Sequence, residues 1–327
     1  MSLGSSTTPL HSAYDAALFD LDGVLYLGHA PVEHAAPAVQ AARTAGMRVA
    51  FVTNNASRTP AVVAEQLNSL DIPAADEEVV TSGQAAAWVV AERVPAGSAV
   101  LVLGTQALVD EIVGVGLKAV RTVEEAGSAG VSAVVQGLSP QTCNADLGEA
   151  AVALRAGAVW VAANTDLTLP SPRGPMPGNG AFVVALQQLT GLEPLVAGKP
   201  DPALHQASVQ RVAGQRPLVI GDRLDTDVLG AVRGGSDSLL VLTGVVDRPA
   251  LLRAPAGSRP TYVASDLRAL SQVQPEVVVD GEAARCGAAE ACYEDGAMIV
   301  TGDGDDALRA EAALAWACAD ADRPLRL

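Results

Sequence analysis

Short apolar runs alternate with amphipathic segments along most of the chain, at the spacing of strands that alternate with helices. Each run is rich in Val, Leu and Ala, which is typical of strands buried on both faces of a parallel sheet. Gly and Pro mark the ends of many helical segments. The pattern therefore predicts an α/β fold. The expected strands cover residues 16–19, 47–53, 79–81, 99–103, 133–136, 158–162, 195–197, 217–220 and 238–242.

Four of the apolar runs are followed directly by polar residues that carry chemistry. In open α/β sheets, ligands bind at the carboxyl ends of the parallel strands, where the loops diverge. We therefore expect these polar residues to form one site. In chain order they are Asp20, Asp22, Thr53, Asn54, Asn55, Lys199, Asp222 and Asp227.

Each group also has a simpler explanation when it is taken alone. The string Asp20-Leu21-Asp22-Gly23 resembles half of a calcium loop, but no further acid follows until Glu33, so the EF-hand ligand set is missing. Asn and Ser after a strand are common in turns, and a lone Lys is usually solvated. The acidic turn at 302–306 lacks a bidentate Glu at the right spacing, which favours a solvated loop.

Composition limits the classes of partner. The chain has 327 residues, of which 49% are apolar and 3% aromatic, and this is enough core material for two compact units. The net charge of −16 would repel the phosphate backbone of a nucleic acid, so we expect no such partner. No uncharged apolar run reaches membrane-spanning length, and we expect a cytoplasmic protein without membrane association. The four cysteines and four histidines are scattered, which argues against zinc or a disulfide framework.

The polar strand ends combine several carboxylates with one lysine. Carboxylate and carbonyl oxygens are the ligands that Mg²⁺ prefers, and a lysine offsets the charge of an anionic substrate. We therefore expect Mg²⁺ as the cofactor and a small phosphorylated metabolite as the partner.

The same residues resemble the four motifs of the haloacid dehalogenase superfamily of phosphatases. The matching segments are Asp20–Leu25, Val52–Asn55, Gly198–Pro200 and Gly221–Arg223 with Asp227, and they look like the NagD and nitrophenylphosphatase branch. The resemblance spans residues 14–272. It implies a Rossmann-like, doubly wound parallel sheet as the core, interrupted by an inserted α/β type II cap domain.

The resemblance also implies catalytic roles. Asp20 would be the nucleophile that forms an aspartyl-phosphate, and Asp22 would protonate the leaving alcohol and then activate water. Mg²⁺ would be bound by the Asp20 carboxylate, the Asp22 backbone carbonyl and Asp222. Asp227 would lie just behind these ligands and orient them.

Phosphate binding is implied for a further group of residues. Thr53 and the backbone amides after Asp20, at Leu21 and Gly23, would hold the phosphoryl oxygens, and Lys199 would offset their charge. Asn54 and Asn55 follow Thr53 and are candidate contacts to phosphate or cap. Asn164 and Asp166 lie in the exit loop of the cap, where the family places substrate-facing residues, although a plain loop explains them equally well.

The expected organisation has four parts. Residues 1–13 are predicted to be a disordered or expression-derived extension, and residues 14–82 and 178–273 the catalytic core. The cap is predicted over 83–177, and residues 274–327 form a small C-terminal α/β extension with two strands and a helix. Bacterial glycerol-3-phosphate phosphatases of this branch carry an extension resembling part of an acetyltransferase fold. This one lacks a phosphate-cradling glycine loop, so we do not expect acetyltransferase activity.

The favoured function is a Mg²⁺-dependent phosphomonoesterase, with glycerol 3-phosphate as the preferred substrate. Sugar phosphates, phosphoglycolate, pyridoxal phosphate and nucleotides stay open as alternatives. So does a phosphotransferase or phosphomutase, in which the phosphoryl group passes to an acceptor other than water. A regulatory binding protein is the alternative outside enzymes. Cap-to-cap dimerisation occurs in relatives, so a homodimer is possible.

Overall fold

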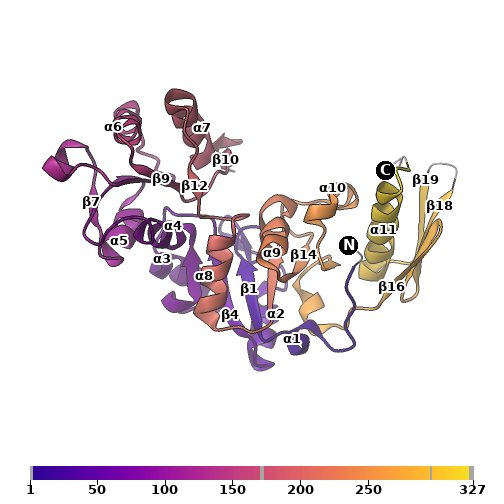
Figure 1. Cartoon of the computed structure of the whole chain (residues 1–327). Helices are drawn as coiled ribbons and strands as arrows, with labels where there is room; N and C mark the ends of the chain where they lie inside the picture. The colour runs from indigo at the N-terminus through magenta and orange to yellow at the C-terminus, as the bar shows by residue number, and fades with distance from the viewer. Residues whose placement is uncertain (1–2, 170–172, 295–296, 324–327) are drawn as a thin grey trace. The chain divides into compact units, whose positions relative to one another are not determined.

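The computed structural model describes residues 3–169, 173–294 and 297–323, and the chain divides into two compact units. The first unit comprises Met1–Val52, Gln66–Ala74 and Ser208–Leu327, and the second comprises Thr53–Glu65 and Ala75–Ala207. Each unit has a parallel sheet with helices packed around it (Figure 1). This confirms the α/β class.

The sheet of the first unit is centred on β1 (Ala16–Asp20). Five strands of the first unit follow the order β15-β14-β13-β1-β4 in this sheet, and neighbours among them are parallel. Phe19 in β1 lies opposite Ile220 on one side and Phe51 on the other, and all three are buried. The strands are therefore covered on both faces, as their apolar sequences predict. The other four are β4 (Arg48–Thr53), β13 (Pro217–Gly221), β14 (Asp237–Val241) and β15 (Tyr262–Ala264).

Short elements connect these strands. A small hairpin follows β1, and a one-turn π-helix follows β13. Two helices, α3 (Pro60–Ser69) and α8 (Pro202–Val212), cross the division between the units. The remaining elements before the C-terminal extension are α1 (Leu10–Ala13), β2 (Tyr26–Leu27), β3 (Ala30–Pro31), α2 (Ala35–Thr44), η3 (Leu224–Val228), α9 (Leu229–Gly234), α10 (Arg248–Leu252), η4 (Ala256–Ser258) and η5 (Leu267–Ser271).

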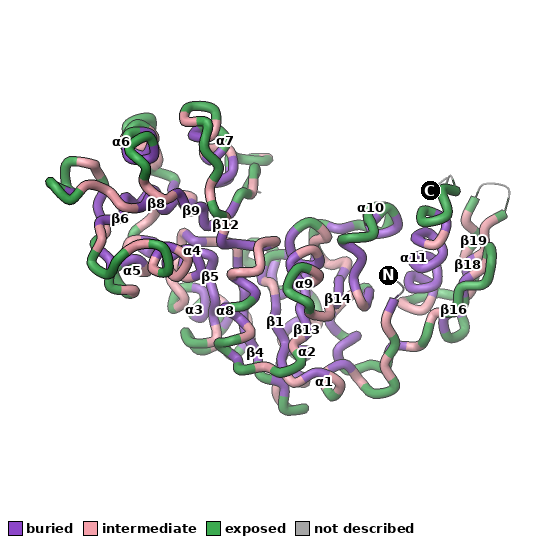
Figure 2. The backbone as a smooth tube through the Cα atoms, in the orientation of Figure 1, coloured by how far each residue is buried: buried purple, intermediate pink, exposed green. Residues whose placement is uncertain are grey.

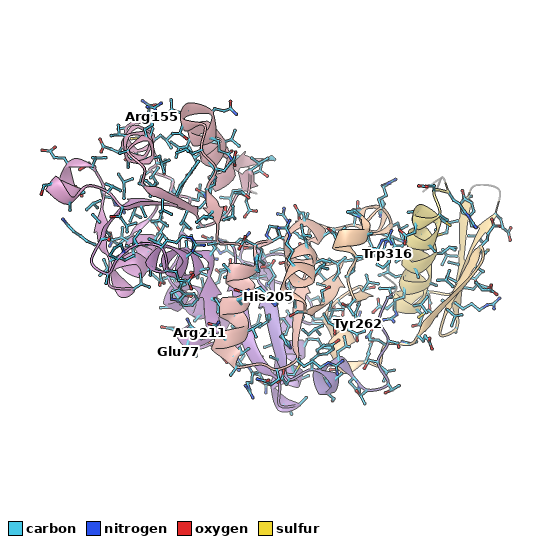
Figure 3. The ribbon with its side chains drawn as sticks, in the orientation of Figure 1. Glu77, Arg155, His205, Arg211, Tyr262 and Trp316 are labelled. Atoms are coloured by element: carbon cyan, nitrogen blue, oxygen red, sulfur yellow. The ribbon has the colours of Figure 1, made fainter. Side chains whose placement is uncertain are left out.

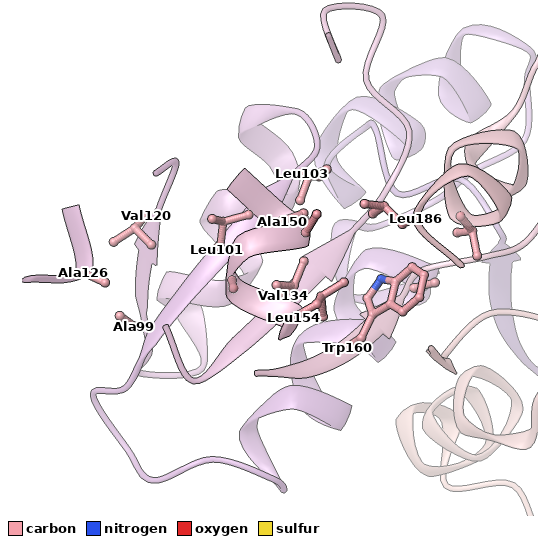
Figure 4. Close-up of a cluster of buried hydrophobic side chains, with 14 residues drawn as sticks. Ala99, Leu101, Leu103, Val120, Ala126, Val134, Ala150, Leu154, Trp160 and Leu186 are labelled. Carbon is pink, nitrogen blue, oxygen red and sulfur yellow. The ribbon is translucent and has the colours of Figure 1, made fainter. Parts of the chain in front are cut away.

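The second unit has a parallel sheet of its own, in the order β12-β9-β8-β6-β7. Its core includes Leu101, Val134 and Trp160, which helices α6 and α7 cover (Figure 4). The elements are η1 (Asp76–Glu78), β5 (Val79–Thr81), α4 (Ser82–Ala91), β6 (Ala99–Leu103), α5 (Gln106–Gly114), β7 (Lys118–Val120), η2 (Glu124–Ala129), β8 (Ala133–Gln136), α6 (Asn144–Arg155), β9 (Val159–Ala162), β10 (Thr168–Leu169), β11 (Met176–Pro177), α7 (Asn179–Thr190) and β12 (Leu195–Val196).

The second unit extends further along the chain than the cap expected over 83–177. Strand β12 pairs with β9, and α7 buries Val183 and Leu186 in the same cluster as Trp160. Residues 179–196 therefore belong with the second sheet, whereas the sequence assigned them to the core range 178–273. The reason is tertiary, because an apolar helix and a two-residue strand can complete either sheet equally well.

The C-terminal extension contains four antiparallel strands and one long helix, α11 (Gly304–Asp320). The sequence indicated two strands and the helix. The two additional strands, β17 and β18, consist mainly of Ala and Cys with a few charged residues, and they carry little apolar signal of their own. The strand order is β16-β17-β18-β19, with β16 (Val277–Asp280), β17 (Ala283–Cys286), β18 (Ala289–Glu294) and β19 (Ala297–Thr301).

The prediction of disorder over residues 1–13 differs from the structure, which is defined from residue 3. Leu3 and Leu10 are buried, and α1 begins at Leu10. The N–H of Gly4 donates to the carbonyl of Thr261 at 2.7 Å, and Ser6 bridges to Gln274. Burial of two leucines and pairing of the backbone give this polar segment a fixed place.

In the part of the chain that the structure describes, we find no helix with the length and apolar character of a membrane span.

Candidate active site

Three carboxylates of the first unit converge at the carboxyl end of its sheet. Asp20, Asp222 and Asp227 each offer one oxygen, and these oxygens all lie within 4.8 Å of one another. Asp20 ends β1 and Asp222 follows β13, the parallel neighbour of β1, so the two strands end at the same edge. Asp222 and Asp227 are buried, with exposures of 0% and 2%. Three carboxylates at this distance, two of them buried, favour a bound cation.

Glycines leave room for the buried carboxylates. A Cβ at Gly23 would lie 2.7 Å from Cγ of Asp222, and one at Gly244 would lie 2.6 Å from the same atom. Gly23 also has a φ of +86°, which disfavours other residues. A side chain at Gly221 would overlap with that of Asp227. Asp222 and Asp227 therefore occupy space that only glycine leaves open.

Asp222 is fixed by backbone donors from the loop after β14. The N–H of Val245 donates to Oδ2 of Asp222 at 2.6 Å, and the N–H of Val246 donates to its carbonyl at 3.1 Å. The hydroxyl of Thr243 donates to the carbonyl of Gly23 at 2.6 Å. We call residues 243–246 the strap. The strap could not be predicted from the sequence, because most of its contacts come from the backbone and carry no side-chain signature.

The third acid after β13, Asp225, does not join the cluster. Its carboxylate accepts two hydrogen bonds from Arg223, at 3.0 and 2.8 Å, and this hydrogen-bonded pairing lowers the pKa of Asp225 below its ordinary value. Asp227 instead accepts the N–H of Arg223 at 3.1 Å. Tertiary placement thus separates acids that the sequence presents together.

Asp22 lies in a loop that folds back on itself directly after β1. The N–H of Gly23 donates to the carbonyl of Tyr26 at 2.8 Å, and Asp22 and Tyr26 form an isolated bridge. The Asp22 side chain is exposed and is not one of the three clustered carboxylates.

The second unit holds another polar cluster, with Asn54 at its centre. Oδ1 of Asn54 accepts the N–H of Lys199 at 2.7 Å, and its Nδ2 donates to the Lys199 carbonyl at 3.1 Å. Lys199 is buried, with 8% of its surface exposed. Thr53 and Asn55 organise the turn before it: the Thr53 hydroxyl accepts the N–H of Asn55 at 3.1 Å, and Asn55 accepts both polar hydrogens of Ser57.

Asn164 and Asp166 join this cluster. Nδ2 of Asn164 donates to the carbonyl of Asn54 at 2.7 Å, and Nδ2 of Asn54 donates to the Asp166 carboxylate at 3.3 Å. Two further residues, which the sequence did not indicate, complete the cluster. The hydroxyl of Ser82 donates to the Asn54 carbonyl at 2.6 Å, and Asn179 donates to the Asn164 carbonyl at 2.7 Å. Both look like ordinary helix-start residues in the sequence.

The donor set of the first unit fits Mg²⁺. Three carboxylates supply hard oxygen ligands, and the glycine positions leave space around two of them. Strap donors and the Arg223 N–H fix the orientation of Asp222 and Asp227. An N/S-preferring metal would find no histidine or cysteine in this group.

Comparisons with known proteins point to one family. A model described as haloacid dehalogenase-like hydrolase matches residues 17–118, and a second, HAD-hydrolase-like, matches residues 196–270. The chain is 44% identical to D-glycerol 3-phosphate phosphatase of Mycobacterium tuberculosis, over 96% of this chain and 90% of that protein. It is 35% identical to a 5′-nucleotidase of Bacillus subtilis, over 72% of this chain and 90% of the relative.

Solved structures agree. The glycerol phosphate phosphatase of M. tuberculosis in complex with magnesium superposes with a TM-score of 0.83 at 42% identity, covering 98% of this chain and 94% of that one. The p-nitrophenyl phosphatase of Archaeoglobus fulgidus gives 0.72 at 27% identity, with 79% and 98% covered. With its acidic cluster at the carboxyl ends of parallel strands, this chain belongs to the haloacid dehalogenase-like hydrolases, among their nitrophenylphosphatase-type phosphatases.

Proposed function

We propose that the protein is a Mg²⁺-dependent phosphomonoesterase that hydrolyses glycerol 3-phosphate. The observation that carries this proposal is the cluster of Asp20, Asp222 and Asp227, whose oxygens lie within 4.8 Å of one another in space left open by glycines. Such a cluster binds a divalent cation and leaves a carboxylate at the end of β1 to act on phosphorus.

Asp20 attacks the phosphorus atom, and the bond from phosphorus to the leaving oxygen breaks as the aspartyl-phosphate forms. Asp22, protonated at this stage, donates its proton to that oxygen and becomes a carboxylate. The Asp22 carboxylate then takes a proton from a water molecule, whose oxygen attacks phosphorus. The bond from phosphorus to the Asp20 oxygen breaks as the water oxygen bonds, which releases inorganic phosphate and regenerates the Asp20 carboxylate.

Mg²⁺ would be held by the carboxylates of Asp20 and Asp222 and by the backbone carbonyl of Asp22, with Asp227 supporting them. When bound, it offsets negative charge on the phosphoryl oxygens. The strap fixes Asp222 through two backbone N–H groups, so its carboxylate is oriented before metal binds.

The phosphate-binding roles follow the motif order. Thr53 and the amide of Leu21 would bind phosphoryl oxygens, and Lys199 would offset charge. The phosphate contact expected of Gly23 is not proposed, because its N–H donates to the carbonyl of Tyr26 at 2.8 Å. The contacts of Asn54 with Lys199 and Asp166 support an organising role for Asn54 within the second unit. Asn55 contributes to the turn after Thr53. We propose Asp166 as a substrate-facing residue of a cap that includes residues 83–177 and admits only small substrates. Asn164 is buried, and its amide bonds the carbonyl of Asn54 and the N–H of Asp166, so we propose that it holds Asp166 in place and does not contact substrate.

The choice of glycerol 3-phosphate is supported by the relative named for D-glycerol 3-phosphate, which matches over 96% of this chain. Less similar relatives are named 5′-nucleotidase and acid sugar phosphatase, at 35% and 34% identity. Nucleoside monophosphates and sugar phosphates are therefore the substrates to test beside it.

The test is release of inorganic phosphate from a panel of esters, with Mg²⁺ and with EDTA. The panel includes both enantiomers of glycerol 3-phosphate, phosphoglycolate, pyridoxal phosphate, sugar phosphates and nucleoside monophosphates, with Asp20→Asn as the blank. We expect one glycerol 3-phosphate enantiomer to be cleaved fastest, and only with metal. If Asp20→Asn released phosphate as fast as the native protein, and both did so in EDTA, the mechanism would be contradicted. Transfer to added alcohols in place of water would favour a phosphotransferase.

A homodimer and a cytoplasmic location stay predictions from the sequence. Light scattering after size-exclusion chromatography measures the first directly.

A further inference from the structure

Helix α11 of the C-terminal extension is buried around most of its circumference. Along its length the residues Ala310, Ala312, Leu314 and Ala315 have no exposed surface, and Figure 2 shows the helix mostly in the colour of buried residues. One side packs against the four-stranded sheet of the extension, in a cluster that includes Leu314. The helix is therefore an interior element and not an appended surface helix.

The opposite side of α11 packs against the parallel sheet of the first unit. Leu308 and Trp316 lie in one hydrophobic cluster with Leu240 of β14 and Val263 of β15. The same cluster contains Val228, the residue after Asp227. It also contains Val246, the last residue of the strap. The packing of α11 thus reaches residues that directly adjoin the acidic cluster.

Polar contacts join α11 to α10 and to Arg259, the residue after η4. Arg248 in α10 pairs with Glu311, which is itself 7% exposed. The indole N–H of Trp316, labelled in Figure 3, donates to the carbonyl of Leu251 at 3.0 Å.

After η4, Arg259 donates to both oxygens of Asp320 at 2.6 and 2.8 Å, and its guanidinium lies 5.5 Å from the Trp316 ring centroid. The segment after the strap is therefore held to α11 at several points.

The strap and α10 are continuous in the chain. Asp247 caps α10 by accepting the N–H of Ala250 at 2.8 Å, and the residue before it, Val246, donates its N–H to the Asp222 carbonyl. A shift of α10 would therefore move the backbone N–H groups that donate to Asp222. Such a shift would also disturb the loop that contains Asp22, since the strap holds Gly23 through Thr243.

We infer that α11 is a positioning element for the acidic cluster, acting through α10 and the strap on Asp222. The catalytic consequence rests on the proposed function, but the effect on metal binding does not. Neither family match reaches residues 271–327, so this contribution is specific to chains that carry the extension.

The test compares two arginine pairs in the full-length protein. Arg248→Met removes the pair with Glu311, and Arg285→Met, the matched control, removes an exposed pair with Glu290 on the sheet of the extension. Mg²⁺ affinity is measured by calorimetry and thermal unfolding by circular dichroism. We expect Arg248→Met to raise the Mg²⁺ Kd by about threefold or more, and Arg248→Lys to restore it, because a cation still pairs with Glu311.

A second pair tests packing. Leu308 packs against the sheet of the first unit, and Leu314 packs against the sheet of the extension. Leu308→Ala and Leu314→Ala therefore each create a cavity beside α11, but on opposite sides of the helix. The inference requires weaker Mg²⁺ binding in Leu308→Ala and near-native binding in Leu314→Ala. Unchanged Mg²⁺ affinity in both Arg248→Met and Leu308→Ala, in folded protein, would overturn it. Altered affinity without phosphate release from any ester would instead leave the inference standing and reject the proposed reaction.

Discussion

The side chain of Asn54 bonds both backbone polar groups of Lys199, accepting its N–H at 2.7 Å and donating to its carbonyl at 3.1 Å. One amide side chain therefore fixes the backbone from which the lysine projects. Lys199 is itself buried, and Asn54 also reaches Asp166. If Lys199 must be placed to offset phosphoryl charge, Asn54 is the residue that determines its position.

Asn54→Ala is expected to lower kcat/KM by about tenfold or more, which corresponds to loss of about 1.4 kcal/mol of transition-state stabilisation. Steady-state phosphate release measures it. Asn68→Ala is the matched control, because Asn68 likewise bonds both backbone groups of one residue, Ala74, but at an exposed position. Equal loss of activity in the two variants would show that the effect is only structural.

Asp20→Asn is expected to lower kcat by at least about a thousandfold, because the amide is not a nucleophile toward phosphorus. The fold should persist, since Asn has the same shape and removes negative charge from a crowded acidic cluster. Asp225→Asn is the control, because this neighbouring acid is exposed and pairs with Arg223. The turnover of the Asp225→Asn variant should stay near that of the native protein. Native turnover in Asp20→Asn would refute the assignment of the nucleophile.

Gly244→Ala is expected to weaken Mg²⁺ binding. The added Cβ would lie 2.6 Å from Cγ of Asp222, so the carboxylate or the strap must move. Gly148→Ala in α6 is the control, because a Cβ there meets nothing within 4 Å, and it should stabilise the protein by about 0.5–1 kcal/mol. Calorimetric Mg²⁺ titration and urea unfolding distinguish the two outcomes. An unchanged Mg²⁺ Kd in Gly244→Ala would mean that the space around the Asp222 carboxylate tolerates a methyl group.

His205 gives a prediction for pH. It lies in α8 and is 7% exposed, and burial lowers its pKa below the ordinary value of 6.5 (Figure 3). Between the folded and unfolded pKa values of His205, the unfolded chain binds more protons than the folded chain. The contribution of His205 to the free energy of unfolding is therefore fully present above pH 6.5 and is lost as the pH falls below that value. His205→Gln should reduce this loss between pH 7.5 and 5.5, measured by urea unfolding. An identical pH dependence in both proteins would exclude His205 as a source.

The sequence predicted that acidic residues from separate strand ends would meet, because strand ends can be recognised from residue type. Apolar runs identified β1 and β13, and parallel strands place their carboxyl ends at one edge, so Asp20 and Asp222 were expected together. The order of the motifs indicated the family. These inferences are local or topological, and they need no knowledge of packing.

Tertiary structure decided the rest. The strap around Asp222 consists mainly of backbone donors, which no residue pattern encodes. Residues 179–196 could have completed either sheet, and only pairing of β12 with β9 assigned them to the second. Strands β17 and β18 were not predicted, because their mostly small residues form strands only when a neighbouring strand and α11 cover them. Residue types determined the reaction, whereas long-range contacts determined which backbone and which helix hold the reacting groups in place.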